Sequence, residues 1–155
     1  MSFKNILFPV DFSDYSLEAL PYVRELARAF DAQVHCLYVV EDAMQFWTAM
    51  GPEAIPVGPL PDEIARLAEG RMARFRSEHL GGFAHEPITS VTVGSSFVEI
   101  ISYSREHKID LIVMTTHGRG AIAHALLGGT AEKVVRKAPC AVLTVRVARH
   151  KFEPP

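Results

Sequence analysis

Two groups of glycines in the C-terminal half of the chain have the types and spacing that bind phosphate. The apolar run 111–114 is followed by a polar, glycine-rich stretch, 115–120. Nine residues separate Gly118 from Gly128, and Gly129 then stands directly before a helix-forming run. A turn after a strand and a turn that opens a helix leave backbone N–H groups free to bind an anion, and a helix N-terminus favours negative charge. The pattern predicts a phosphate site, although glycines that only form tight turns would look the same.

The residues after these glycines extend the pattern. From Thr130 the chain reads Thr-Ala-Glu-Lys-Val-Val-Arg-Lys-Ala-Pro-Cys-Ala-Val-Leu, and together with the glycine spacing this resembles the universal stress protein family. Nucleotide-binding members of that family carry Gly, two residues, Gly, nine residues, then Gly and Ser or Thr. The resemblance implies that the ligand is ATP or another adenine nucleotide, AMP or ADP.

This sequence departs twice from the family pattern. Thr115 stands where the first glycine is expected and adds a side chain near the phosphate position. Gly129 stands where the Ser or Thr is expected, and Thr130 follows directly. The glycine lacks the hydroxyl donor, but without a side chain it allows a phosphate to come close to the backbone. Two interpretations stay open: a protein that binds adenine nucleotides, and a family member without nucleotide affinity that acts through protein contacts.

The resemblance also implies which residues contact the nucleoside. Asp11, with the backbone near Pro9 and Val10, would contact adenine or ribose. Val39 would supply a backbone contact to adenine. Judged from the sequence alone, Asp11 is equally suited to cap the helix that follows it.

The remaining expected contacts lie on the phosphate side. Met114 and Thr115 would flank the ribose and the first phosphate. The residues expected to hold the phosphates are Gly118, Arg119, Gly128, Gly129 and Thr130. The guanidinium of Arg119 suits a phosphate oxygen if it turns inward, and it is otherwise a solvated loop cation.

The apolar segments between these loops predict five β-strands, at residues 5–10, 33–40, 88–93, 110–115 and 141–147. Helical periodicity predicts helices at about 14–30, 62–80, 96–107 and 130–137. Strands and helices that alternate in this way form parallel sheets with right-handed crossovers. We therefore expect an α/β fold with an open, doubly wound sheet of five parallel strands and helices on both faces.

The family resemblance implies the strand order 3-2-1-4-5, which places the first and fourth strands side by side. Sheets of this kind bind ligands outside the carboxyl ends of the strands where the strand order reverses. The loops that leave these two strands, 9–13 and 115–120, are also the most polar ones after any strand. Loop chemistry and topology thus predict the same crevice.

Local signals set the expected helix starts. Ser13 or Asp14 is expected to cap the first helix, a single amphipathic helix that continues to Phe30. Ser96 and Glu99 match a capping box at the start of the third helix.

Composition bounds the class of protein. The 155 residues, 48% of them hydrophobic, fit one globular domain over residues 1–148 with a frayed tail at 149–155. A formal net charge of −2 and the lack of a basic run argue against nucleic-acid or membrane partners. The N-terminus lacks the long apolar core of a signal peptide and no stretch is long enough to span a bilayer, so we expect a cytoplasmic protein. Cys36 and Cys140 are expected to be buried, reduced thiols.

Residues 43–60 form the least regular segment, with several prolines and glycines around Phe46 and Trp47. It is either a solvated loop whose aromatic rings pack against the next helix, or a lid or partner-binding flap. The sequence does not separate these alternatives.

The signatures of nucleotide enzymes are missing. No Gly-Lys pair occurs, so there is no P-loop lysine, and no Gly-x-Ser-x-Gly elbow carries a nucleophile. His117 and His124 have no recognised metal spacing, and His35 is expected to be a packed core residue. The only metal we consider is Mg²⁺ accompanying a bound triphosphate. We expect a stress-response regulatory protein, at most a slow ATPase, that forms a homodimer through the strand 141–147, as the family suggests.

Overall fold

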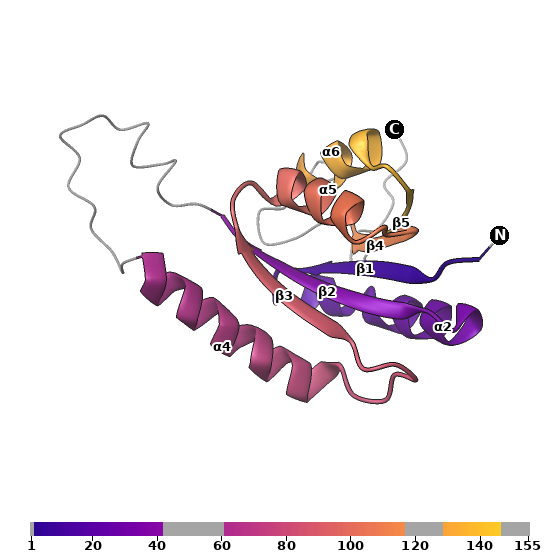
Figure 1. The fold of residues 1–155 in the computed structure, drawn as a ribbon, viewed down its shortest axis with the longest axis horizontal. Helices are drawn as coiled ribbons and strands as arrows, with labels where there is room; N and C mark the ends of the chain where they lie inside the picture. Colours follow the sequence, from indigo (N-terminus) through magenta and orange to yellow (C-terminus); the bar gives the residue numbers. More distant parts are fainter. Residues whose placement is uncertain (1, 42–60, 117–128, 147–155) are drawn as a thin grey trace, which may run out of the picture.

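A computed structural model describes residues 2–41, 61–116 and 129–146. These residues fold around one sheet of parallel strands in the order β3-β2-β1-β4-β5 (Figure 1). The strands are β1 (Asn5–Val10), β2 (Gln33–Val40), β3 (Ile88–Val93), β4 (Leu111–Thr115) and β5 (Ala141–Val145). The expected fold class and strand order are confirmed.

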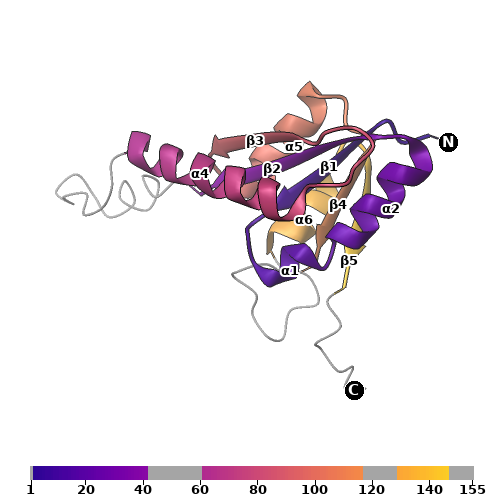
Figure 2. The same cartoon turned by 90° about the horizontal axis from the view of Figure 1, so that it is seen from below.

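Helices cover both faces of the sheet. They are α1 (Asp14–Leu17), α2 (Leu20–Phe30), α4 (Pro61–His79), α5 (Ser96–Glu106) and α6 (Gly129–Lys137). Helices α2 and α4 lie on one face and α5 and α6 on the other (Figures 1 and 2). Successive residues of β1 therefore enter different cores: Ile6 and Phe8 pack with α2 and α4, whereas Leu7 packs with α5 and α6. Burial on both faces explains why the strands read as continuous apolar runs.

Strands β1 and β4 are held together at their amino ends by Asp110. Its Oδ2 accepts hydrogen bonds from the backbone N–H groups of Lys4 (2.8 Å) and Asn5 (2.9 Å), and its own N–H donates to the carbonyl of Asn5 (2.9 Å). Ladder pairing of β1 with β4 then covers only Ile6↔Leu111 and Leu7↔Ile112. Strand β4 begins at Leu111, one residue later than predicted.

The segment predicted as one helix up to Phe30 is two helices. Helix α1 ends at Leu17, and α2 starts at Leu20 with Pro21 in its first turn. Pro21 has no N–H to donate to the carbonyl of Leu17, so the helical hydrogen-bond ladder cannot run through this point. The prediction of one continuous helix was wrong for this reason.

The predicted capping box of α5 is also wrong. The N-cap is Ser95, and its side chain makes no capping hydrogen bond. The Ser96 hydroxyl instead donates to Glu41 (2.9 Å), and the Glu99 carboxylate accepts from Thr92 (3.3 Å). Both side chains that suggested a box thus bond to residues in or just after the neighbouring strands, contacts that a local sequence pattern does not encode.

The remaining boundaries differ by a few residues. Strand β5 ends at Val145, two residues before the predicted end. Helix α6 begins at Gly129, one residue earlier than predicted, and α4 spans Pro61–His79. The segment 43–60 and the tail 149–155 lie outside the described residues. No helix among the described residues is long and apolar enough to cross a membrane.

A polar cluster lies between the sheet and α5. His35 on β2 is only 5% exposed, as expected for a core histidine, and its Nδ1 is 3.1 Å from the Tyr103 hydroxyl. That hydroxyl also lies 3.1 Å from Ser90 Oγ, and the Tyr103 ring stacks on His107 at 3.8 Å. Burial lowers the pKa of His35, and the nearby His107 lowers it further. The neutral imidazole is therefore the form that this core accepts.

Replacing the carboxylate of Asp110 is expected to weaken the fold. Asp110→Ala leaves the N–H groups of Lys4 and Asn5 without this acceptor. We expect a loss of about 1.5 kcal/mol of unfolding free energy, at the low end for charge-assisted bonds because the Lys4 bond is exposed. Urea unfolding measures it, and Asp110→Asn, which keeps a neutral acceptor, should lose less. Equal midpoints for the wild type and Asp110→Ala would contradict this.

The buried His35 predicts a pH dependence of stability. Its pKa is lower in the folded than in the unfolded chain, so its contribution to stability is complete above the unfolded value near 6.5 and is lost as pH falls through the folded value. Between about pH 8 and about pH 5 the wild type should lose more unfolding free energy than His35→Gln. Chemical unfolding at several pH values measures both slopes. Parallel slopes would show that His35 does not titrate in this way.

Candidate functional site

The carboxyl ends of β1 and β4 form the edge where the strand order reverses. Pairing of β1 with β2 continues to Val10↔Tyr38, and pairing of β4 with β5 continues to Thr115↔Val145. Ladder pairing of β1 with β4 stops earlier, at Leu7↔Ile112. Beyond that point, the ladder pairing of the described residues continues only between β1 and β2 and between β4 and β5. This switch-point edge is where such sheets place their ligands.

The loop after β1 is ordered by its own polar side chains. Asp11 Oδ1 accepts hydrogen bonds from the backbone N–H of Ser13 (3.0 Å) and from its hydroxyl (2.5 Å). Ser13 is the N-cap of α1, and its Oγ accepts from the N–H of Ser16 (3.4 Å). The cap predicted at Ser13 or Asp14 is thus Ser13. Asp11 itself does not cap the helix, and its partly exposed carboxylate is fixed in direction by Ser13.

Between these two residues, Phe12 has a left-handed backbone with φ of 59°. A bulky side chain is rarely found there, and the conformation costs about 1–3 kcal/mol that surrounding contacts must offset. The Phe12 ring packs on Tyr38 at 4.4 Å and on Phe75 at 5.4 Å between ring centroids. Strained backbone of this kind concentrates at functional sites. No signal in the sequence marks Phe12, because an Asp-x-Ser turn does not specify the conformation of its middle residue.

The other expected site residues that the structure describes occupy three neighbouring strands and one helix. Pro9 and Val10 end β1, Met114 and Thr115 end β4 beside it, and Val39 lies near the end of β2 on the other side of β1. The residues that begin α6 are Gly129 and Thr130. The remaining ones, Gly118, Arg119 and Gly128, lie outside the described residues, as do His117 and His124.

The burial of these residues differs. Val10, Val39 and Met114 are each less than a tenth exposed, so their side chains belong to the cores. Thr115 and Thr130 are half-buried, and Gly129 is exposed.

Neither cysteine has the properties of a nucleophile. Both are free thiols, as predicted; Cys36 is fully buried, whereas Cys140 is only half-buried. Burial raises the pKa of Cys36 to about 12 and raises that of Cys140, so the thiolate is disfavoured in both. Within residues 2–41, 61–116 and 129–146, no group of three or more His, Cys, Asp or Glu residues could hold a metal ion.

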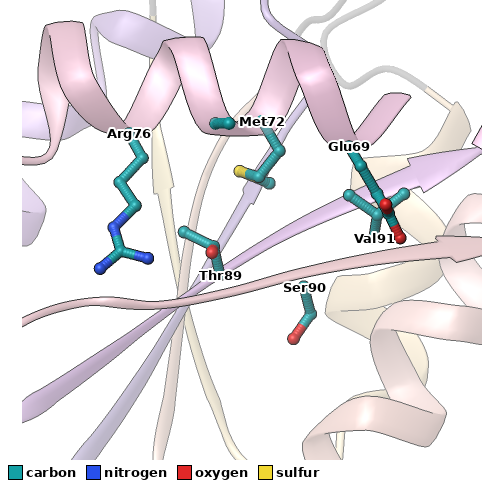
Figure 3. A pocket seen from close by; sticks show the side chains of 7 residues that line it. Glu69, Met72, Arg76, Thr89, Ser90 and Val91 are labelled. Carbon is teal, nitrogen blue, oxygen red and sulfur yellow. The ribbon is translucent and has the colours of Figure 1, made fainter. Parts of the chain in front are cut away.

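A groove of about 320 Å³ lies elsewhere, between α4 and the edge strand β3 (Figure 3). Glu69, Met72 and Arg76 line it from the helix, and Thr89 and Val91 from the strand. The Ser90 hydroxyl is engaged with Tyr103, and Arg76 forms an exposed ion pair with Glu86. The groove is two strands away from β1, so it is not part of the switch-point edge.

Comparison with known proteins identifies the family of this chain. The model of the universal stress protein family matches residues 2–146. The chain belongs to the universal stress protein family. It is 36% identical to universal stress protein MJ0531 of Methanocaldococcus jannaschii over 148 residues, which cover 93% of this chain and 82% of that protein. The family resemblance expected from the glycine motif is confirmed.

Solved structures of other universal stress proteins share the fold. The structure of MJ0577 from Methanocaldococcus jannaschii is 25% identical, with a TM-score of 0.79 over 97% of this chain and 100% of that one. A universal stress protein in complex with cAMP is 23% identical, with a TM-score of 0.62 over 94% of this chain and 98% of that one. Compared with the family motif, this universal stress protein differs at Thr115, the last residue of β4, and at Gly129, the first of α6.

Proposed function

We propose that this universal stress protein is a cytoplasmic regulatory protein that binds ATP or another adenine nucleotide between the ends of β1 and β4. The observation that carries the proposal is the Asp11 carboxylate, which Ser13 holds in direction in the loop that leaves β1, the strand next to β4. A fixed carboxylate at a switch-point edge is well suited to accept hydrogen bonds from ribose hydroxyl or adenine amino groups. We take residues 1–148 as the single domain that performs this function.

The phosphates would extend from the end of β4 toward α6. Thr115 would flank the ribose and first phosphate, and the N–H groups of Gly129 and Thr130 would meet the phosphate chain at the start of a nine-residue helix. The first turn of α6 also holds Glu132, whose charge is partly offset by Arg136 at 3.5 Å. Gly118, Arg119 and Gly128 would complete the phosphate contacts, and Mg²⁺ would accompany a triphosphate.

Binding is proposed here, and catalysis is not. The sequence carries no P-loop lysine and no nucleophile elbow. His35 is buried against α5, so it is poorly placed for acid–base catalysis. The pKa values of both described thiols are raised, so the thiolate that a nucleophile needs is disfavoured. The relative solved with cAMP supports an adenine nucleotide as the class of ligand. Occupancy of the site would then be the signal that partners recognise.

The proposal predicts that nucleotide affinity depends on Asp11. Removal of a charged hydrogen-bonding group costs about 1.5–3 kcal/mol, so Asp11→Ala should weaken ATP binding about tenfold or more in calorimetric titrations. Asp14→Ala is the matched control, because Asp14 is an exposed carboxylate at the start of α1. Its affinity should equal that of the wild type.

Two results would overturn the proposal. One is a wild-type protein that carries no adenine nucleotide after purification and gives no heat with ATP, ADP or AMP. Such a result would favour the other interpretation, a family member that acts only through protein contacts, as the changes at Thr115 and Gly129 would permit. The other is an Asp11→Ala variant that binds ATP as tightly as the wild type, which would place the nucleotide elsewhere.

We also propose that two copies associate through β5. This strand is the last in the sheet order and pairs with β4 on one side. Its other side has no partner strand among the described residues. Soluble proteins normally cover such an apolar edge, and antiparallel pairing with a second copy would do so.

Light scattering tests this assembly. Pairing of the two β5 strands predicts the mass of a dimer, about twice 17.1 kDa, at micromolar concentration. A mass of one chain across the micromolar range would refute it.

A further inference from the structure

A cation and two aromatic rings meet beside the loop that carries Asp11. The guanidinium carbon of Arg71, on α4, lies 4.8 Å from the centroid of the Phe12 ring and 5.8 Å from that of Tyr38. The two rings lie 4.4 Å apart, so Arg71 covers both of them. We call Arg71, Phe12 and Tyr38 the Arg71 stack. It joins α4, the end of β2 and the loop after β1, with α4 on the same sheet face as α2 (Figure 2).

The stack acts on a residue whose backbone needs support. Phe12 has a φ of 59°, which a bulky residue adopts only when its surroundings impose it. The ring of Phe12 is the part of this residue that packs on Tyr38 and Phe75, and Arg71 lies over the ring on the exposed side of α4. Because Phe12 stands between Asp11 and Ser13, its backbone angles set the position of Asp11 relative to its hydrogen-bond partner.

We propose that Arg71 is a positioning residue of the switch-point site: its contact with Phe12 and Tyr38 holds the left-handed turn that directs the Asp11 carboxylate. Arg71 acts through Phe12 and Tyr38 and does not itself contact the ligand. The proposal rests on the nucleotide-binding function proposed above and adds α4 to the elements that determine affinity.

An arginine suits this position better than other residues. Its planar guanidinium stacks on aromatic faces and stays charged at every physiological pH, whereas a lysine offers a compact, strongly hydrated charge. Loss of the guanidinium would let the Phe12 turn sample other conformations, and the nucleotide would then have to select the correct one. Affinity should fall although no ligand contact has been removed.

The test compares two arginines of α4. Arg71→Ala removes the stack, and Arg74→Ala is the matched control, because Arg74 is exposed on the same helix and pairs with Glu78. We expect about three- to tenfold weaker ATP binding by calorimetry for Arg71→Ala and unchanged binding for Arg74→Ala. Equal affinities for Arg71→Ala and the wild type would overturn the proposal, as would equal weakening by both variants.

A double-mutant cycle separates positioning from a general loss of stability. Phe12→Leu keeps an apolar side chain but removes the ring that Arg71 covers. If Arg71 acts through Phe12, adding Arg71→Ala to Phe12→Leu should weaken ATP binding less than it does in the wild type. Full additivity would overturn the proposal. Melting temperatures of all variants without nucleotide ensure that affinities refer to folded protein.

A measurement without nucleotide distinguishes this inference from the function on which it rests. The N–H of Ser13 donates to Asp11 only while the turn is intact, so its hydrogen exchange in NMR spectra reports the turn directly. Exchange should be faster in Arg71→Ala than in Arg74→Ala or the wild type, and equal rates would refute the role of Arg71. A wild type without ATP affinity would refute the proposed function, while the exchange rates would still decide whether Arg71 holds the loop.

Discussion

The short contact between β1 and β4 is the constraint on which the rest of this structure depends. Asp110 holds the amino ends of the two strands together, and their ladder pairing covers only two residue pairs. Each strand continues toward its carboxyl end with its outer partner alone. The strand order reverses at the same place, so helices leave the sheet to opposite faces there. The carboxyl ends of parallel strands at such a switch point are where sheets of this kind place their ligands.

Support for the loop after β1 comes from distant parts of the chain. Ser13 orients Asp11 locally, but the Phe12 ring between them packs on Tyr38 from β2 and on Phe75 from α4. The conformational cost at Phe12 is therefore met by contacts that form only when the sheet and α4 are in place. A site built this way is preorganised by the fold, which is an efficient route to affinity. Under the proposed function, nucleotide binding and the packing of α4 should accordingly be coupled.

The sequence predicted the fold well, because the signals for strands and their order are local or shared by the family. Apolar runs marked β1 and β2 to the residue, since both faces of these strands are buried. Errors arose where distant partners outweigh local patterns, as at Ser96 and Glu99, whose side chains bond to Glu41 and Thr92. Of the candidate site, Asp11 could be predicted from its place after a strand. The turn at Phe12 and its contact with Arg71 could not, because no periodicity links a loop to a helix this far along the chain.

The most direct test of nucleotide binding at the ends of β1 and β4 is an NMR titration of isotope-labelled protein with ATP. It reports where a nucleotide binds as well as whether it does. Binding at the switch-point edge predicts that the largest shifts fall on backbone amides at and just after the end of β1, at the end of β4 and at the start of α6, including Asp11, Thr115 and Thr130. Amides at the α4–β3 groove, such as that of Thr89, should stay unchanged. Shifts centred on that groove, or no shifts at saturating ATP, would contradict it.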